Sequence, residues 1–133
     1  MKKADSFSRR LDDLADDAER RGTVLRRPVS GRDNIKRLVE AVGTLYASQQ
    51  PTFYGAVDQR HFLQYQAKLR TGLDLEAVGV IERDETGLVQ RVTMTFAPLD
   101  AAVSLSAELR DIVGEEFGDD LFCDASVNEI AAS

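Results

Sequence analysis

Residues 73–98 read LDLEAVGVIERDETGLVQRVTMTFAP, which is the pattern of one long β-hairpin. The four-residue polar segment 84–87 ends in glycine and suits a type I turn closed by a residue with positive φ. On the second arm, one face carries the apolar residues Leu88, Val92, Met94 and Phe96, with Gln90 as the polar exception. A two-stranded hairpin is marginal in water, so the rest of the chain must cover this apolar face.

The composition is that of an ordinary globular chain of 133 residues with a net charge of −6. This length predicts one domain with one core. Basic residues gather in residues 1–37, but acids alternate with them as on a solvated helix face, and the overall acidity argues against a nucleic-acid partner. No apolar run approaches the roughly 20 residues that span a bilayer, so no membrane partner is expected.

The cysteine content predicts a reducing location. Cys123 is the single cysteine and cannot form an internal disulfide, and residues 1–6 carry no apolar segment of a secretory signal. We therefore expect a cytoplasmic protein. Acids surround Cys123 in the sequence and disfavour its thiolate, which argues against a nucleophile.

The first thirty residues predict a short helix. Apolar residues at positions 7, 11, 14, 15 and 18 form a narrow stripe over about residues 5–20, and Ser6 suits the N-cap. Arg20, Arg21 and Gly22 then read as the basic last turn and the stop of this helix. Residues 23–25 suit a short strand.

A second helix, over residues 34–48, has the clearest helical spacing in the chain. Asp33 suits its cap, and the helix is the natural cover for the hairpin. Gly43 inside it costs about 1 kcal/mol relative to alanine and suggests a close packing contact. Pro51 ends this segment.

Two further strands, residues 52–57 and 60–69, lead into the hairpin. Alternation in the second strand places five residues on one face: His61, Leu63, Tyr65, Ala67 and Leu69. The short connections predict a four-stranded antiparallel meander. A last helix begins at Asp100 as its cap and runs to Gly114.

The chain therefore divides into an α+β domain, residues 1–114, and an acidic tail, residues 115–133. Apolar residues of the tail dock on the sheet or on a neighbouring subunit, or the tail is loose. The predicted fold is a curved antiparallel sheet of about four to five strands wrapped round helices. Such a cone can hold a small molecule in its mouth.

Three motifs stand in order along the chain: LADDA at residues 14–18, PVSGRDNI at 28–35, and ERDETGLV at 82–89 followed by FAPL at 96–99. Together they resemble the SnoaL-like branch of the nuclear-transport-factor-2-like (NTF2-like) superfamily. The resemblance implies a cone-shaped α+β barrel, an internal pocket and often a homodimer through the sheet. Family members include polyketide cyclases, steroid isomerases, epoxide hydrolases, dehydratases and non-catalytic binding domains, so the fold does not decide the function.

The sequence departs from the family at the positions that carry chemistry. The long first helix that closes the cone is replaced by a short one, and the tyrosine donor of the steroid isomerases belongs to the missing helix. By the same resemblance, the carboxylate base falls near Gly22 and the oxyanion-supporting acid near Gly79. Glycine at both positions argues against that mechanism.

The candidate site residues are those expected to face the pocket. The proton-handling candidates are His61, the only histidine, and Tyr46, on the apolar face of the second helix. Each has a plain alternative, because His61 could be an exposed residue at a strand start and Tyr46 a core residue. The residues expected to line a ligand pocket are Tyr46, Tyr54, His61, Tyr65, Met94 and Phe96. The sequence shows no metal-ligand cluster and no phosphate-binding loop, so no metal or cofactor is expected.

Three functions remain open from the sequence. The first is binding of a small apolar molecule in the cone. The second is a lyase, isomerase or cyclase acting on an apolar ring compound, with His61 and Tyr46 as proton handlers. The third is a non-catalytic protein-interaction domain whose cone is filled by its own side chains.

Overall fold

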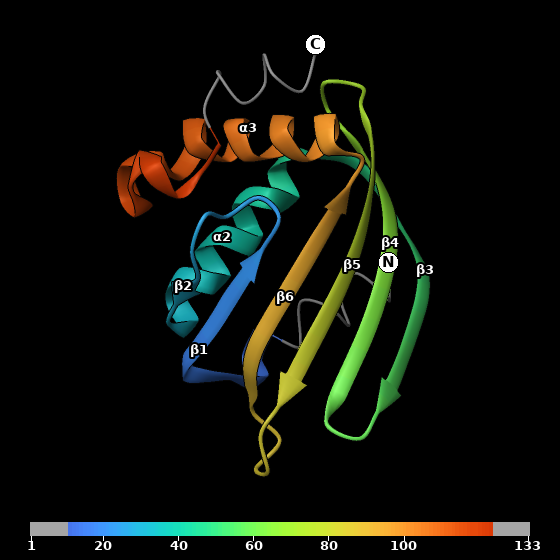
Figure 1. The fold of residues 1–133 in the computed structure, drawn as a ribbon, viewed down its shortest axis with the longest axis vertical. Coiled ribbons are helices and arrows are strands. Elements are labelled where there is room, and N and C mark those ends of the chain that lie inside the picture. The colour runs from blue at the N-terminus through green and yellow to red at the C-terminus, as the bar shows by residue number, and fades with distance from the viewer. Residues whose placement is uncertain (1–10, 124–133) are drawn as a thin grey trace.

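A computed structural model describes residues 11–123, in which one curved sheet is packed against two long helices (Figure 1). The strands are β1 (Leu14–Gly22), β2 (Val29–Ser30), β3 (Tyr46–Val57), β4 (Arg60–Leu69), β5 (Asp74–Arg83) and β6 (Val89–Ala97). The helices are α2 (Arg32–Leu45) and α3 (Leu99–Phe117), with single 3-10 turns η1 (Leu11–Asp13) and η2 (Asp119–Leu121). The α+β class is the predicted one.

The six strands follow the order β2-β1-β6-β5-β4-β3. Strands β3 to β6 form the predicted antiparallel meander. Strand β1 extends the sheet by pairing parallel to β6, and the short β2 pairs antiparallel to β1. In Figure 1, α3 crosses one end of the strands and α2 lies beside β1. We call the face of the sheet toward these helices the inner face and the opposite one the outer face.

The hairpin of β5 and β6 follows the prediction, including its turn. Gly87 has φ +90, and Asp84 accepts backbone hydrogen bonds from Thr86 (2.8 Å) and Leu88 (3.1 Å). The register shifts near the start of β6, so Val89 is buried whereas Leu88 is exposed. The face predicted for Leu88 is therefore wrong, because the irregularity interrupts the two-residue alternation.

The predicted first helix is wrong within the described residues, because residues 14–22 form strand β1. The pairing of β1 with β6 shifts between Leu14 and Glu19. This irregularity brings Leu14, Ala15 and Ala18 into the core at intervals that imitate a helix. Residues 5–10 of that prediction lie outside the described residues. The short strand expected at residues 23–25 is a turn.

Helix α2 is confirmed, with shifted ends. It starts after Gly31, no side chain caps it, and it ends where Tyr46 begins β3. Pro51 therefore lies inside β3, which tolerates proline because β3 is the edge of the sheet. An added Cβ at Gly43 would meet nothing within 4 Å, so the predicted close contact is absent.

Helix α3 continues three residues past Gly114, and Asp100 lies within its first turn instead of capping it. Beyond the helix, Leu121 and Phe122 are buried in the core. Ser106 holds this segment, because its hydroxyl donates to the Val24 carbonyl (2.7 Å) and accepts from the Cys123 backbone (2.9 Å). Residues 124–133 of the predicted tail lie outside the described residues.

Candidate functional site

The six predicted site residues lie on the inner face, and four of them form two separate clusters. Tyr46 and Tyr65 form one cluster, and Tyr54 and His61 form the other. Strand pairing explains the faces, because Tyr54 is opposite Leu63 and His61 is opposite Ile81, and both partners point inward. The alternation predicted for residues 60–69 is confirmed.

The Tyr46–Tyr65 pair is a buried hydroxyl contact. The two hydroxyl oxygens are 2.7 Å apart, and the rings meet edge to face with centroids 5.9 Å apart. Tyr46 is 8% exposed and Tyr65 is 6% exposed. Burial is the main cause that raises the pKa of each hydroxyl, so both groups are neutral at ordinary pH.

Arg20 is the inner-face residue that the sequence reading missed. It lies on β1 opposite Val92 of β6 and is 4% exposed. Its charge favours the ionised forms of Tyr46 and Tyr65 and so acts to lower the pKa of both hydroxyls, against the larger effect of burial. Desolvation by burial is the largest influence on Arg20 and lowers its pKa. The available signal was the alternation of Ala18, Arg20 and Gly22, which a strand reading would have placed on one face.

The second cluster is a polar chain at the opposite end of β4. Tyr54 Oη is 2.7 Å from His61 Nδ1, and Arg83 Nε donates to His61 Nε2 at 3.1 Å. Arg83 also pairs with Asp13 (3.3 Å) and donates to the Gly87 carbonyl (2.6 Å). An arginine has only donors, so His61 Nε2 is the acceptor in its contact with Arg83. Tyr54 is 49% exposed, so this cluster reaches the surface.

Met94 and Phe96, which the sequence predicts to line a pocket, are buried in the inner face. Met94 lies between Gly22 and Gly79 on the neighbouring strands. A Cβ at Gly22 would overlap the backbone oxygen of Met94, and one at Gly79 would lie 2.7 Å from Met94 Sδ. The close approach of β6 therefore requires glycine at the position where the resemblance places a carboxylate base.

Carboxylates of the described residues gather elsewhere. An open groove is lined by Asp17, Glu19, Glu82, Arg83, Gln90 and Arg91. Glu82 there faces Arg60 (3.8 Å) and Arg91 (3.7 Å). Residues 11–123 contain no group of three or more His, Cys, Asp or Glu side chains arranged to hold a metal ion. Neither long helix in that range is both long enough and apolar enough to cross a membrane.

Comparisons with known proteins identify the fold. A protein with a cystatin-like fold from Silicibacter pomeroyi matches with a TM-score of 0.75 and 21% identity, over 83% of this chain and 77% of that one. A steroid delta-isomerase from Pseudomonas aeruginosa matches with a TM-score of 0.75 and 16% identity, over 87% and 89%. A SnoaL-like family protein from Agrobacterium tumefaciens matches with a TM-score of 0.52 and 12% identity, over 69% and 83%.

No protein-family model matches the sequence, and no curated protein does. Other matching structures are NTF2-like proteins of unknown function. The expected α+β fold is therefore confirmed, and the chain shares its fold with cystatin-like, NTF2-like and SnoaL-like proteins of known structure. At these identities the likeness establishes the fold, and the activity of each neighbour remains a statement about that neighbour.

Proposed function

We propose that this chain binds a small, largely apolar molecule on the inner face of the sheet, with a hydroxyl of the Tyr46–Tyr65 pair donating to an oxygen of that molecule. The observation that carries the proposal is an unused donor. Two hydroxyls have two O–H groups, and the contact at 2.7 Å uses one of them. No acceptor within residues 11–123 receives the other, so the pair can donate to a ligand.

The surroundings of the pair suit an apolar ligand body. The inner-face side chains of the neighbouring strands are mostly apolar and buried, among them Leu63, Ile81, Val92, Met94 and Phe96. Binding sites for small molecules are typically apolar with a few polar groups that fix orientation. The Tyr46–Tyr65 pair would supply that orientation.

The energetics also favour a binding role over a purely structural one. Burying hydroxyls gains little stability, and replacing both partners by apolar groups of the same shape can be neutral. A core with phenylalanine at both positions would fill the same space without a polar atom. Retaining the hydroxyls is explained when they contact a ligand.

Native mass spectrometry tests this proposal with naphthalene-2-carboxamide, a neutral apolar probe with one acceptor oxygen. We expect one probe per chain in the wild type, and binding weakened about three- to tenfold in the double variant Tyr46→Phe/Tyr65→Phe, which removes both possible donors of the hydrogen bond. Tyr54→Phe is the matched control, because its hydroxyl lies in the other cluster. A wild type that retains no probe would contradict binding, and equal retention by the double variant would contradict the role of the hydroxyl pair.

We infer a proton-transfer enzyme as the second candidate, acting as lyase, isomerase or cyclase on an apolar ring compound. The contact between Tyr54 Oη and His61 Nδ1 favours it, since a phenol bonded to an imidazole can pass a proton. No hydrogen bond within the described residues joins His61 to Tyr46, so each hydroxyl would act from its own cluster. The assay is exchange of the α-protons of 2-tetralone in D₂O, which His61→Gln should slow. Exchange no faster than in buffer would contradict this candidate.

A further inference from the structure

Arg20 is the only charged side chain buried within the described residues. Apart from tyrosines, one other polar side chain is buried in the described residues, that of Ser106. Its hydroxyl donates to the Val24 carbonyl and accepts from the Cys123 backbone N–H. The guanidinium of Arg20 has neither a hydrogen bond nor an ion pair with any residue of the range 11–123. No side-chain nitrogen among the described residues is both fully buried and without a hydrogen-bond partner. The Arg20 nitrogens, which have no partner there, therefore keep some solvent-accessible surface.

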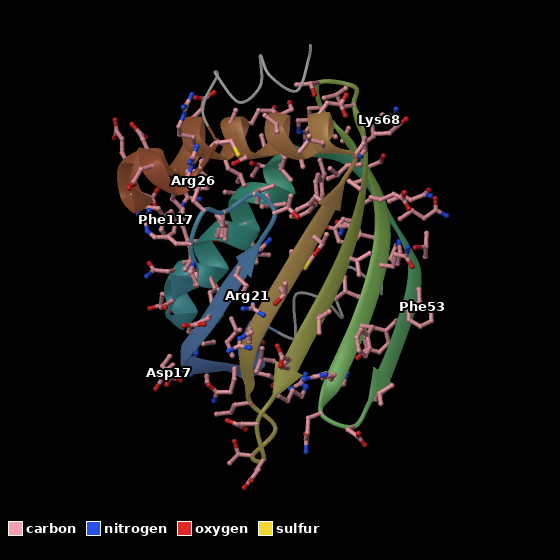
Figure 2. The ribbon with its side chains drawn as sticks, in the orientation of Figure 1. Asp17, Arg21, Arg26, Phe53, Lys68 and Phe117 are labelled. Carbon is pink, nitrogen blue, oxygen red and sulfur yellow. The ribbon has the colours of Figure 1, made fainter. Side chains whose placement is uncertain are left out.

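The acids near Arg20 in the sequence are turned away from it. Asp16 pairs with Arg32 at 2.6 Å, and Glu19 and Arg21 flank Arg20 on the outer face of β1. Figure 2 shows Arg21 lying over β1 and β6, where its Nε donates to the Thr93 hydroxyl at 3.2 Å. The buried side chains of α2, which packs against β1, are all apolar: Ile35, Leu38, Ala41 and Val42. The protein therefore places no counter-ion beside Arg20 within the described residues.

An uncompensated buried charge is expensive. Arginine stays protonated in proteins, so it cannot escape the desolvation cost by losing its proton. Burial is also the largest influence on Arg20, and it acts against the charged form. The inner face thus combines the five N–H donors of Arg20 with the unused O–H of the Tyr46–Tyr65 pair, and it offers no matching acceptor.

We propose that the ligand of this site carries a carboxylate, which forms an ion pair with Arg20 on the inner face. This inference rests on the proposed binding function and names its ligand class, a monoanionic carboxylic acid with an apolar ring body. A planar carboxylate matches the fork of a guanidinium with two parallel hydrogen bonds and has lone pairs left for the tyrosine O–H. A single buried positive charge compensates one negative charge, which favours a carboxylate over a dianionic phosphate.

The test is calorimetric titration with two probes of the same shape, naphthalene-2-carboxylate and naphthalene-2-carboxamide. In the wild type we expect the carboxylate to bind at least about tenfold more tightly than the amide, because a charge-assisted pair replaces a neutral one. In Arg20→Met the affinity ratio should fall to about one, while the amide still binds. Arg21→Met is the matched control, since it removes the same charge from the outer face and should keep the ratio.

Each outcome separates this inference from the proposed function. Binding of both probes with an unchanged ratio in Arg20→Met overturns the role of Arg20 and leaves binding intact. Failure of both probes to bind the wild type overturns the proposed function itself. Without ligand, Arg20→Met should also unfold at a higher temperature than the wild type, because a buried charge is removed.

A measurement on the wild type keeps the test valid if Arg20→Met does not fold. The side-chain Nε–H resonance of Arg20 can be assigned by its loss in Arg20→Lys. Naphthalene-2-carboxylate at saturation should shift this resonance, and the carboxamide should shift it less. An unmoved resonance at saturation with the carboxylate would overturn the proposal.

Discussion

At the scale of single residues, the Tyr46–Tyr65 contact predicts that the two hydroxyls are energetically coupled, because each is the polar partner of the other. Both side chains are buried, and their oxygens are 2.7 Å apart. Removing one hydroxyl leaves the other in an apolar setting without a partner. Removing both leaves an apolar pair of nearly the same shape.

A double-mutant cycle measures this coupling. We expect Tyr46→Phe and Tyr65→Phe each to lower the free energy of unfolding by about 1–2 kcal/mol. The double variant should lie within about 1 kcal/mol of the wild type, so the two effects do not add. Urea unfolding of all four proteins gives the coupling energy. Strictly additive losses would show that the hydroxyls do not depend on each other.

The sequence predicted the face of a candidate residue correctly where apolar and polar residues alternate along a strand. It failed where charged residues dominate the segment. Tyr65 and His61 were placed together because residues 60–69 alternate cleanly. Arg20 was missed because Glu19, Arg20 and Arg21 read as a solvated charge run, and only the pairing of β1 with β6 turns the middle one inward. A long-range strand pairing leaves no trace in local composition.

At the scale of elements, β1 shows how two local rules can conflict. Its buried positions Leu14, Ala15 and Ala18 carry helical spacing, yet the segment pairs with β6 and β2. Tertiary pairing, and not local spacing, decided that this segment is a strand. An irregularity in a strand can bury residues at the same intervals as one turn of a helix. The hairpin and β4 had no such irregularity over most of their length, which is why their bounds were close to the predicted ones.

Gly22 at the end of β1 should be one of the least replaceable residues. Its φ is +152, and an added Cβ would overlap the backbone oxygen of Met94. We expect Gly22→Ala to lower the free energy of unfolding by about 3 kcal/mol or more, because the backbone of β6 must move. Gly43→Ala in α2 is the control, as its Cβ would meet nothing within 4 Å and should stabilise by about 0.5–1 kcal/mol. Comparable effects of the two substitutions in chemical denaturation would contradict this packing.

The turn between β5 and β6 should make the stability of the fold depend on pH. Hydrogen bonds from the Thr86 and Gln90 side chains, with smaller help from backbone N–H groups, lower the pKa of Asp84 to about 2. A carboxylate with a depressed folded-state pKa stabilises the fold above its ordinary pKa, and that contribution is lost as pH falls from about 4 through about 2.

The comparison of wild type with Asp84→Ala tests this. Their difference in stability should be full at pH 7 and should shrink toward pH 2, measured by urea unfolding across that range. Glu85→Ala is the control in the same turn, and its difference from wild type should not follow this profile. A difference for Asp84→Ala that persists unchanged at pH 2 would contradict the role of the ionised carboxylate.

At the scale of the whole molecule, the fold followed from the meander. Four consecutive strands with short connections and an amphipathic helix leave few α+β arrangements, and the motif resemblance selected the cone among them. The sequence predicted about four to five strands, whereas the sheet has six. Strands β1 and β2 were not recognised, because β1 joins β6 in parallel across some seventy residues of chain. Burial of Leu121 and Phe122 was likewise a matter of tertiary packing.

The family resemblance predicts a homodimer through the sheet, and exposed apolar residues on the outer face agree with that prediction. Val78 is 41% exposed and Phe53 is 55% exposed there, beside the half-buried Phe62 and Val80. We expect a homodimer of twice the 14.7 kDa chain mass in light scattering after gel filtration. Val78→Lys should give a monomer, whereas Leu99→Lys, at an exposed residue of α3, should not. A wild-type monomer at tens of micromolar would contradict this expectation.

Binding of a small molecule at the inner face can be detected directly at Met94. The chain has two methionines, so a protein labelled with [methyl-¹³C]methionine gives two methyl resonances, of which Met94 lies buried in the inner face. Adding naphthalene-2-carboxamide should shift the Met94 resonance, assigned by its loss in Met94→Leu, saturably through the ring current of the bound probe. A Met94 resonance that stays in place up to the solubility limit of the probe would contradict the account.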